Sequence, residues 1–199
     1  MLNLPESTEV KRPLPKAQLF KRFDWKPSQR NSFDGDVARL DFVNWIAPRT
    51  LPAIADGAEI KEIFVIEVSL KSRNFDPNNI VLLAKNIPQR VVYLLRFENE
   101  AMLAVYHTKL FTSSWQPLDN VSVPLDGLNL DTVWQNIVAF VGKLELTDGN
   151  SLTEQIRVND ERARLVREIE SLERLMRSAS QPRRQRELYA EIKKLKSKL

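Results

Sequence analysis

The 199-residue sequence contains no cysteine, one histidine and five glycines. The absence of cysteine excludes a disulfide framework, a thiolate nucleophile, iron–sulfur ligation and every cysteine-based zinc site. A single histidine also excludes metal sites built from several imidazoles. Five glycines are too few for a collagen-like or glycine-rich chain. The sequence therefore predicts no resident cofactor.

Long apolar runs are missing as well. No stretch approaches the length of about 18 to 20 apolar residues that a membrane-spanning helix needs. The opening residues, MLNLPESTEVKRP, lack the apolar segment of a secretory signal. We therefore expect a cytoplasmic protein without a membrane partner. Glycine-rich phosphate loops and the nucleophile elbow of serine hydrolases are also absent, so neither activity is predicted.

The residues that are present favour one folded domain and a basic appendage. Apolar residues make up 43% of the chain, which is enough for a packed core. Residues 151–199 carry 13 Lys and Arg against 8 Asp and Glu, a net charge of +5, whereas residues 1–150 carry 17 against 18. We predict a globular domain at 1–150 and a basic tail at 151–199.

Hydrophobic periodicity predicts an α+β fold for the globular domain, with a small, mostly antiparallel sheet. Residues 37–47 and 62–72 have the composition of strands, and residues 89–97 and 101–111 predict two more. Between them, Asp76 and Pro77 predict the start of a helix that ends before Pro88. This order is a β-α-β-β core with one covering helix.

Other segments surround this core. Residues 1–15 are predicted to run extended and to lead into a short amphipathic helix at 15–23, and residues 26–36 are predicted to form a polar loop. An irregular stretch with a short edge strand near Trp115 precedes a second covering helix, for which Asp131 is the expected N-cap.

The tail has the spacing of two amphipathic helices separated by the residues SASQP. Apolar residues spaced four, three and four apart form a stripe on each helix, at Leu165, Ile169, Leu172, Met176, Leu188, Ile192, Leu195 and Leu199. This pattern predicts an antiparallel helical hairpin with a coiled-coil seam. Each stripe covers only about two heptads, so we expect the hairpin to need a partner: the globular domain, a second copy of the chain or another protein.

Glu67 and Lys71 on the strand at 62–72, with Asp41 upstream, are the candidate catalytic residues. Restriction-endonuclease-like nucleases place an acidic residue and a Glu-x-Lys pair on adjacent strands, because two carboxylates hold Mg²⁺ and the lysine orients the attacking water. Here the glutamate and lysine are four residues apart, about 13 Å along a strand, so they cannot serve one metal-bound water. A degenerate Mg²⁺-dependent nuclease is one hypothesis; ion pairs with neighbouring strands are the structural alternative.

Two other features of the sequence are candidate sites. His107 ends a predicted strand without the partners that a catalytic histidine needs, and we interpret it as structural. Arg183, Arg184 and Arg186 begin the second tail helix, where the helix dipole also favours anions. A DNA-binding module that uses this basic hairpin is therefore a further hypothesis, and a solvated hairpin tip is its alternative.

Several segments resemble a known family. They are LPESTEVKRPLPKAQLF, EIFVIEVSLKS, KNIPQRVVYLLRF, LDGLNLDTVWQNIV and the charged tail with its Leu and Ile spacing. Together they are similar to the bacterial family catalogued as domain of unknown function 4391. The resemblance covers nearly the whole chain, and its motifs are structural. It implies a position beside DNA helicase and methyltransferase genes of restriction-modification or phage-defence type.

These observations favour a protein that is not an enzyme. We expect a non-catalytic accessory subunit that docks through its helical hairpin on a helicase or methyltransferase partner, as the resemblance implies. The hairpin also offers a route to a homo-oligomer, and its arginines offer a route to nucleic acid.

Overall fold

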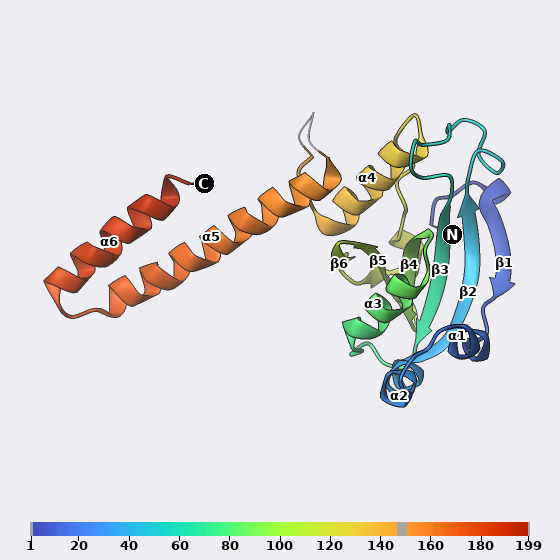
Figure 1. The fold of residues 1–199 in the computed structure, drawn as a ribbon, viewed down its shortest axis with the longest axis horizontal. Coiled ribbons are helices and arrows are strands. Elements are labelled where there is room, and N and C mark those ends of the chain that lie inside the picture. The colour runs from blue at the N-terminus through green and yellow to red at the C-terminus, as the bar shows by residue number, and fades with distance from the viewer. Residues whose placement is uncertain (1, 147–150, 199) are drawn as a thin grey trace. The chain divides into compact units, whose positions relative to one another are not determined.

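A computed structural model describes residues 2–146 and 151–198. The chain divides into two units, Met1–Glu145 and Leu146–Leu199. The first unit is built around one sheet, and the second is a pair of helices (Figure 1). The predicted α+β class is confirmed. Within the described residues, no helix has the length and apolar character required to cross a membrane.

The sheet has the strand order β1-β2-β3-β4-β5-β6, with β7 paired to β5. β3 and β4 are parallel, and the other named pairs are antiparallel. Helix α3 (Pro77–Asn86) connects β3 to β4, which confirms the predicted β-α-β-β core. The strands are β1 (Glu9–Pro13), β2 (Val37–Ile46), β3 (Ile63–Leu70), β4 (Arg90–Phe97), β5 (Glu100–His107), β6 (Lys109–Thr112) and β7 (Gln116–Pro117).

One face of the sheet packs against three helices. These are α1 (Lys16–Arg22), α2 (Pro27–Asp36) and α3 (Pro77–Asn86). Leu19, Phe33 and Ile80 point from these helices into a core that includes Ile66 and Tyr93 of the sheet. The amphipathic helix predicted at 15–23 and the helix predicted after Asp76 thus pack on a common sheet face, which we call the first face.

The second face carries α4 (Leu130–Gly142). Arg90 and His107 lie on this face because side chains alternate along β4 and β5. The indole N–H of Trp134 in α4 is 3.4 Å from Nδ1 of His107, and the Arg90 guanidinium lies 5.7 Å from the centre of the Trp134 ring. The domain is therefore a three-layer arrangement in which the sheet separates α1, α2 and α3 from α4.

The prediction of a polar loop at 26–36 is wrong, because residues 27–36 form helix α2. Pro27 begins the helix, where a missing N–H costs nothing, and the side chain of Gln29 accepts a hydrogen bond from the backbone N–H of Lys26. A single apolar anchor, Phe33, is completely buried. One anchor leaves no stripe for periodicity analysis to detect.

Two boundaries also differ from expectation. The single strand predicted at 101–111 is a hairpin of β5 and β6, because Thr108 has a φ of 60° and turns the chain. The N-cap of α4 is Asn129, whose side chain accepts from Thr132, rather than Asp131. Asp131 instead accepts hydrogen bonds from the backbone N–H groups of Ala58 (2.6 Å) and Ile60 (2.8 Å).

The extended N-terminal segment contains a strand that the sequence pattern does not predict. β1 lies at a margin of the sheet, follows the short 3₁₀-helix Glu6–Thr8 and is exposed along its length. Its register with β2 shifts between Glu9 and Arg12, and Lys11 within the shift has a φ of 48°. The strand ends at Pro13, which has no N–H to donate.

The second unit is a helical hairpin. It consists of α5 (Leu152–Ser178) and α6 (Pro182–Lys196), which run antiparallel (Figure 1). The side chains of Lys196 and Glu173 join the two helices at 2.8 Å. Among the stripe residues, Ile169, Leu188 and Ile192 are buried, while Leu165, Leu172, Met176 and Leu195 are half-buried. Leu199, the last predicted stripe residue, lies outside the described residues.

Candidate functional site

Asp41 and Glu67 lie directly opposite each other on β2 and β3. Residues opposite each other on antiparallel strands project to the same side, and here that side is the second face. Their side chains are only 17% and 13% exposed. The structure thus brings together two of the three residues that sequence analysis proposed as catalytic candidates.

An arginine accompanies each of these carboxylates. Nε and Nη2 of Arg39 lie 2.6 and 2.7 Å from the two oxygens of Asp41, a bidentate contact. This hydrogen bond and the charge of Asp41 raise the pKa of Arg39. On the other side, Nη1 of Arg96 in β4 lies 3.3 Å from Oε1 of Glu67. Both acids are therefore ion-paired.

A solvent-open hollow of about 360 Å³ contains these side chains. Lys11 also lines it, so three cations and two carboxylates share the hollow. Register shifts in β1 and in β2 lie beside Lys11 and Arg39. Bulges of this kind re-aim side chains and are frequent near functional sites. The sequence pattern does not single out Lys11, Arg39 or Arg96; the spacing of two residues between Arg39 and Asp41 is the one signal of this cluster in the sequence.

Lys71 does not join this group. Its Nζ donates to the backbone oxygen of Asp34 at 2.6 Å and lies 3.9 Å from that residue's carboxylate. Two residues after Glu67, where a Glu-x-Lys pair has its lysine, this chain has Ser69. The register partner of Ser69 on β4 is Arg96. Glu67 therefore has an opposite charge on a neighbouring strand, as in the structural alternative, whereas the partner of Lys71 lies on helix α2 and not on a strand.

The chemistry of the hollow has two parts. Mg²⁺ is commonly held by one or two carboxylates together with substrate phosphates, and arginine and lysine bind phosphate oxygens. Asp41 and Glu67 would hold such an ion, in competition with Arg39, which contacts both oxygens of Asp41, and with Arg96, which contacts one oxygen of Glu67. No cluster of three or more acidic or histidine side chains suited to a metal occurs in residues 2–146 and 151–198.

His107 lies at the end of β5 and packs against α4 through Trp134. Burial lowers the pKa of its imidazole, and the nearby charge of Arg90 lowers it further, although Glu59 opposes this shift. A neutral ring suits the contact in which Nδ1 accepts from the Trp134 indole.

The tail arginines lie on the surface of α6. Arg183 and Arg184 both reach Glu187, at 3.3 Å, in ion pairs of the helix itself. The Arg183 side chain is 93% exposed. Arg186 is also exposed. This arrangement agrees with a solvated hairpin tip.

The chain is thus a mixed α+β protein with a polar hollow on one sheet face and a helical-hairpin tail. Residues 2–199 match the family model described as domain of unknown function, DUF4391, so the chain belongs to that family. The resemblance that the sequence motifs indicated is confirmed. No curated protein and no solved structure matches the chain.

Proposed function

We propose that the protein is a non-catalytic accessory subunit of a bacterial DNA restriction-modification or phage-defence system, and that its helical hairpin docks on a helicase or methyltransferase. The observation that supports this proposal is the unequal length of the two helices. α5 has 27 residues and α6 has 15. Val158 lies one heptad before Leu165 on the same side of α5, with the exposed Arg162 between them, and is 48% exposed.

The packing within the hairpin is also slight. Ile169, Leu188 and Ile192 are its fully buried stripe residues. The other described stripe residues are only half-buried, so the apolar seam of the hairpin is incomplete in the single chain. An added helix from a partner would complete the seam and cover Val158, and we include this coiled-coil geometry and a cytoplasmic location in the proposal.

Co-expression tests the docking role. The full-length chain, carrying an affinity tag, is purified from cells that also produce the helicase or the methyltransferase encoded beside its gene. We expect Val158→Asp, and deletion of residues 151–199, to abolish recovery of the partner, since a carboxylate in an apolar seam is strongly disfavoured. Ser171→Asp is the matched control, because Ser171 is exposed on a different side of α5.

Two results would contradict the proposal. Undiminished recovery of the partner with Val158→Asp and with the deletion would remove the hairpin from the interaction. A homodimer in light scattering that Val158→Asp converts to a monomer would show that a second copy of the chain, and not another protein, covers the stripe.

A Mg²⁺-dependent nuclease is the second candidate, and the register of Asp41 with Glu67 favours it. Two carboxylates on adjacent strands, with cations beside them, have the composition that phosphodiester cleavage requires. Incubation of supercoiled plasmid DNA with the protein and Mg²⁺ tests this candidate. Cleavage that persists in Glu67→Ala would come from a contaminant and would dismiss it.

A further inference from the structure

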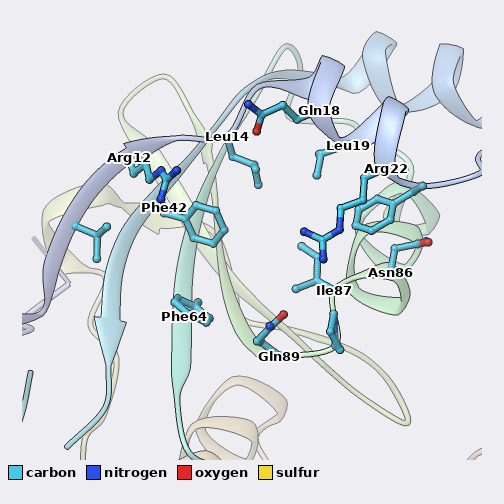
Figure 2. A pocket seen from close by; sticks show the side chains of 13 residues that line it. Arg12, Leu14, Gln18, Leu19, Arg22, Phe42, Phe64, Asn86, Ile87 and Gln89 are labelled. Atoms are coloured by element: carbon cyan, nitrogen blue, oxygen red, sulfur yellow. The ribbon is translucent and has the colours of Figure 1, made fainter. Parts of the chain in front are cut away.

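A second cavity, on the first face of the sheet, has a different character from the polar hollow. It has a volume of about 350 Å³ and lies between α1, the strands β1 to β3 and the α3–β4 connection (Figure 2). Most of its lining is apolar, including Leu14, Leu19, Phe23, Phe42, Phe64 and Ile87. Small-molecule sites have volumes of about 300–1,000 Å³ and a mainly apolar lining, so this cavity has the size and character of one.

The ends of two helices create the cavity. α1 stops at Arg22 and α3 stops at Asn86, so Phe42 of β2 and Phe64 of β3 remain only partly buried between them. The two rings pack edge to face with their centres 5.7 Å apart. Neighbouring strands fix their backbones, so the aromatic surface is pre-formed rather than assembled around a ligand.

Two arginines give the cavity its charge. Arg12 comes from β1 and Arg22 from α1, and no aspartate or glutamate lines the cavity. In residues 2–146 and 151–198, neither guanidinium has an ion pair or a side-chain hydrogen bond. Figure 2 shows the Arg22 side chain extending from α1 into this apolar cavity toward Ile87, while Arg12 lies near Phe42. Elsewhere on this domain, Arg39, Arg73 and Arg96 are each paired with an acid.

We propose that this cavity binds a small organic anion: a carboxylate attached to an aliphatic or aromatic body. The apolar body packs on Phe42 and Phe64, and the carboxylate accepts hydrogen bonds from the Arg22 guanidinium. Arg12 adds positive charge at the opposite margin. A cationic ligand is disfavoured because both charged groups that line the cavity are arginines.

Calorimetry with a matched pair of probes tests the site. Octanoate and 1-octanol have the same carbon chain length and differ in charge. We expect octanoate to bind the full-length protein at millimolar concentration or below. Arg22→Gln should weaken octanoate binding about tenfold, as expected for loss of a hydrogen bond between charged groups, and leave octanol binding unchanged. Lys21→Gln is the control. Lys21 precedes Arg22 in the same helix and does not line the cavity, so this variant should bind octanoate and octanol as the wild type does.

Localisation and folding complete the experiment. The methyl NMR signals of Leu14, Leu19 and Ile87 should shift on addition of octanoate, and those of Leu188 and Ile192 should not. Equal melting temperatures of the wild type and Arg22→Gln exclude unfolding as the cause of weaker binding. Absence of octanoate binding, equal affinity for octanoate in Arg22→Gln, or shifts confined to other methyl groups would each overturn the proposal.

Discussion

Asp41 and Glu67 are register partners on β2 and β3, and each is held by its own arginine. Stability and cleavage measurements on variants of these two residues therefore distinguish a structural role from a catalytic one. Partly exposed ion pairs contribute only about 0–1 kcal/mol to stability, because solvent screens them. We therefore expect Glu67→Ala to lower the free energy of unfolding by less than about 1 kcal/mol in urea denaturation, and to abolish any Mg²⁺-dependent cleavage.

Asp41→Ala is the companion variant. If the two carboxylates hold one ion, both variants lose cleavage; if they are only ion pairs, the wild type itself leaves plasmid DNA intact in Mg²⁺. Cleavage lost in Glu67→Ala but retained in Asp41→Ala would contradict the shared-ion geometry.

Leu188 should be essential for the hairpin and dispensable for the sheet domain. It is 1% exposed, and replacing a buried leucine by alanine typically costs about 2–5 kcal/mol. We expect Leu188→Ala to reduce the helical signal in circular dichroism and to leave the tryptophan fluorescence unchanged, because all four tryptophans lie between positions 25 and 134.

Tyr189→Ala is the matched control for this experiment, because Tyr189 follows Leu188 directly in α6 but is 62% exposed. Loss of the same helical signal in both variants would mean that α6 depends on side chains other than those of the stripe.

Asp131 should make the domain sensitive to acid. Burial raises the pKa of its carboxyl, but hydrogen bonds from the backbone N–H groups of Ile60, Glu59 and Ala58 outweigh this effect, and the pKa is lowered overall. Stability from a lowered pKa is fully present above the ordinary carboxyl range and is lost as the pH falls through the folded-state value. We expect Asp131→Asn to cost roughly 1–2 kcal/mol at pH 7, allowing for solvent screening.

The measurement is urea denaturation of the wild type and Asp131→Asn across the acid range. The difference between them should shrink once the pH falls below about 4. A difference that stays constant down to pH 2 would show that the charge of Asp131 is not what holds residues 58–60.

Tyr93 presents an opposite case. It is 1% exposed, and its hydroxyl has no hydrogen-bond partner among the described residues. Burial raises the pKa of this phenol. A buried hydroxyl without a partner costs about 1–3 kcal/mol, so Tyr93→Phe should raise the melting temperature. Tyr106→Phe, at a half-buried site, should change it little; a lower melting temperature for Tyr93→Phe would reveal a partner for the hydroxyl.

Strong periodicity made much of this fold predictable. The alternation along β3 and β4, and the Asp76 and Pro77 signal for α3, correspond to elements that bury a complete apolar face. α2 was missed because Phe33 alone anchors it. β1 was missed because its side chains are exposed and backbone pairing with β2 defines it.

The polar hollow was only partly predictable for a related reason. The alternation of side chains places Glu67 on a mixed face, but the partner of a charge depends on strand register. Three separate strands supply Lys11, Arg39 and Arg96, and bulges that no short pattern encodes adjust two of them. The same limit applies to Lys71, whose partner Asp34 belongs to the helix that was expected to be a loop.

The irregular first strand has a consequence for aggregation. A flat outer strand exposes backbone groups that can template fibril growth from another chain. Here the left-handed conformation at Lys11 twists that margin, and Pro13 removes one donor from it. Neighbouring molecules therefore find little uninterrupted backbone to pair with at this margin, and association there must rely on side-chain recognition.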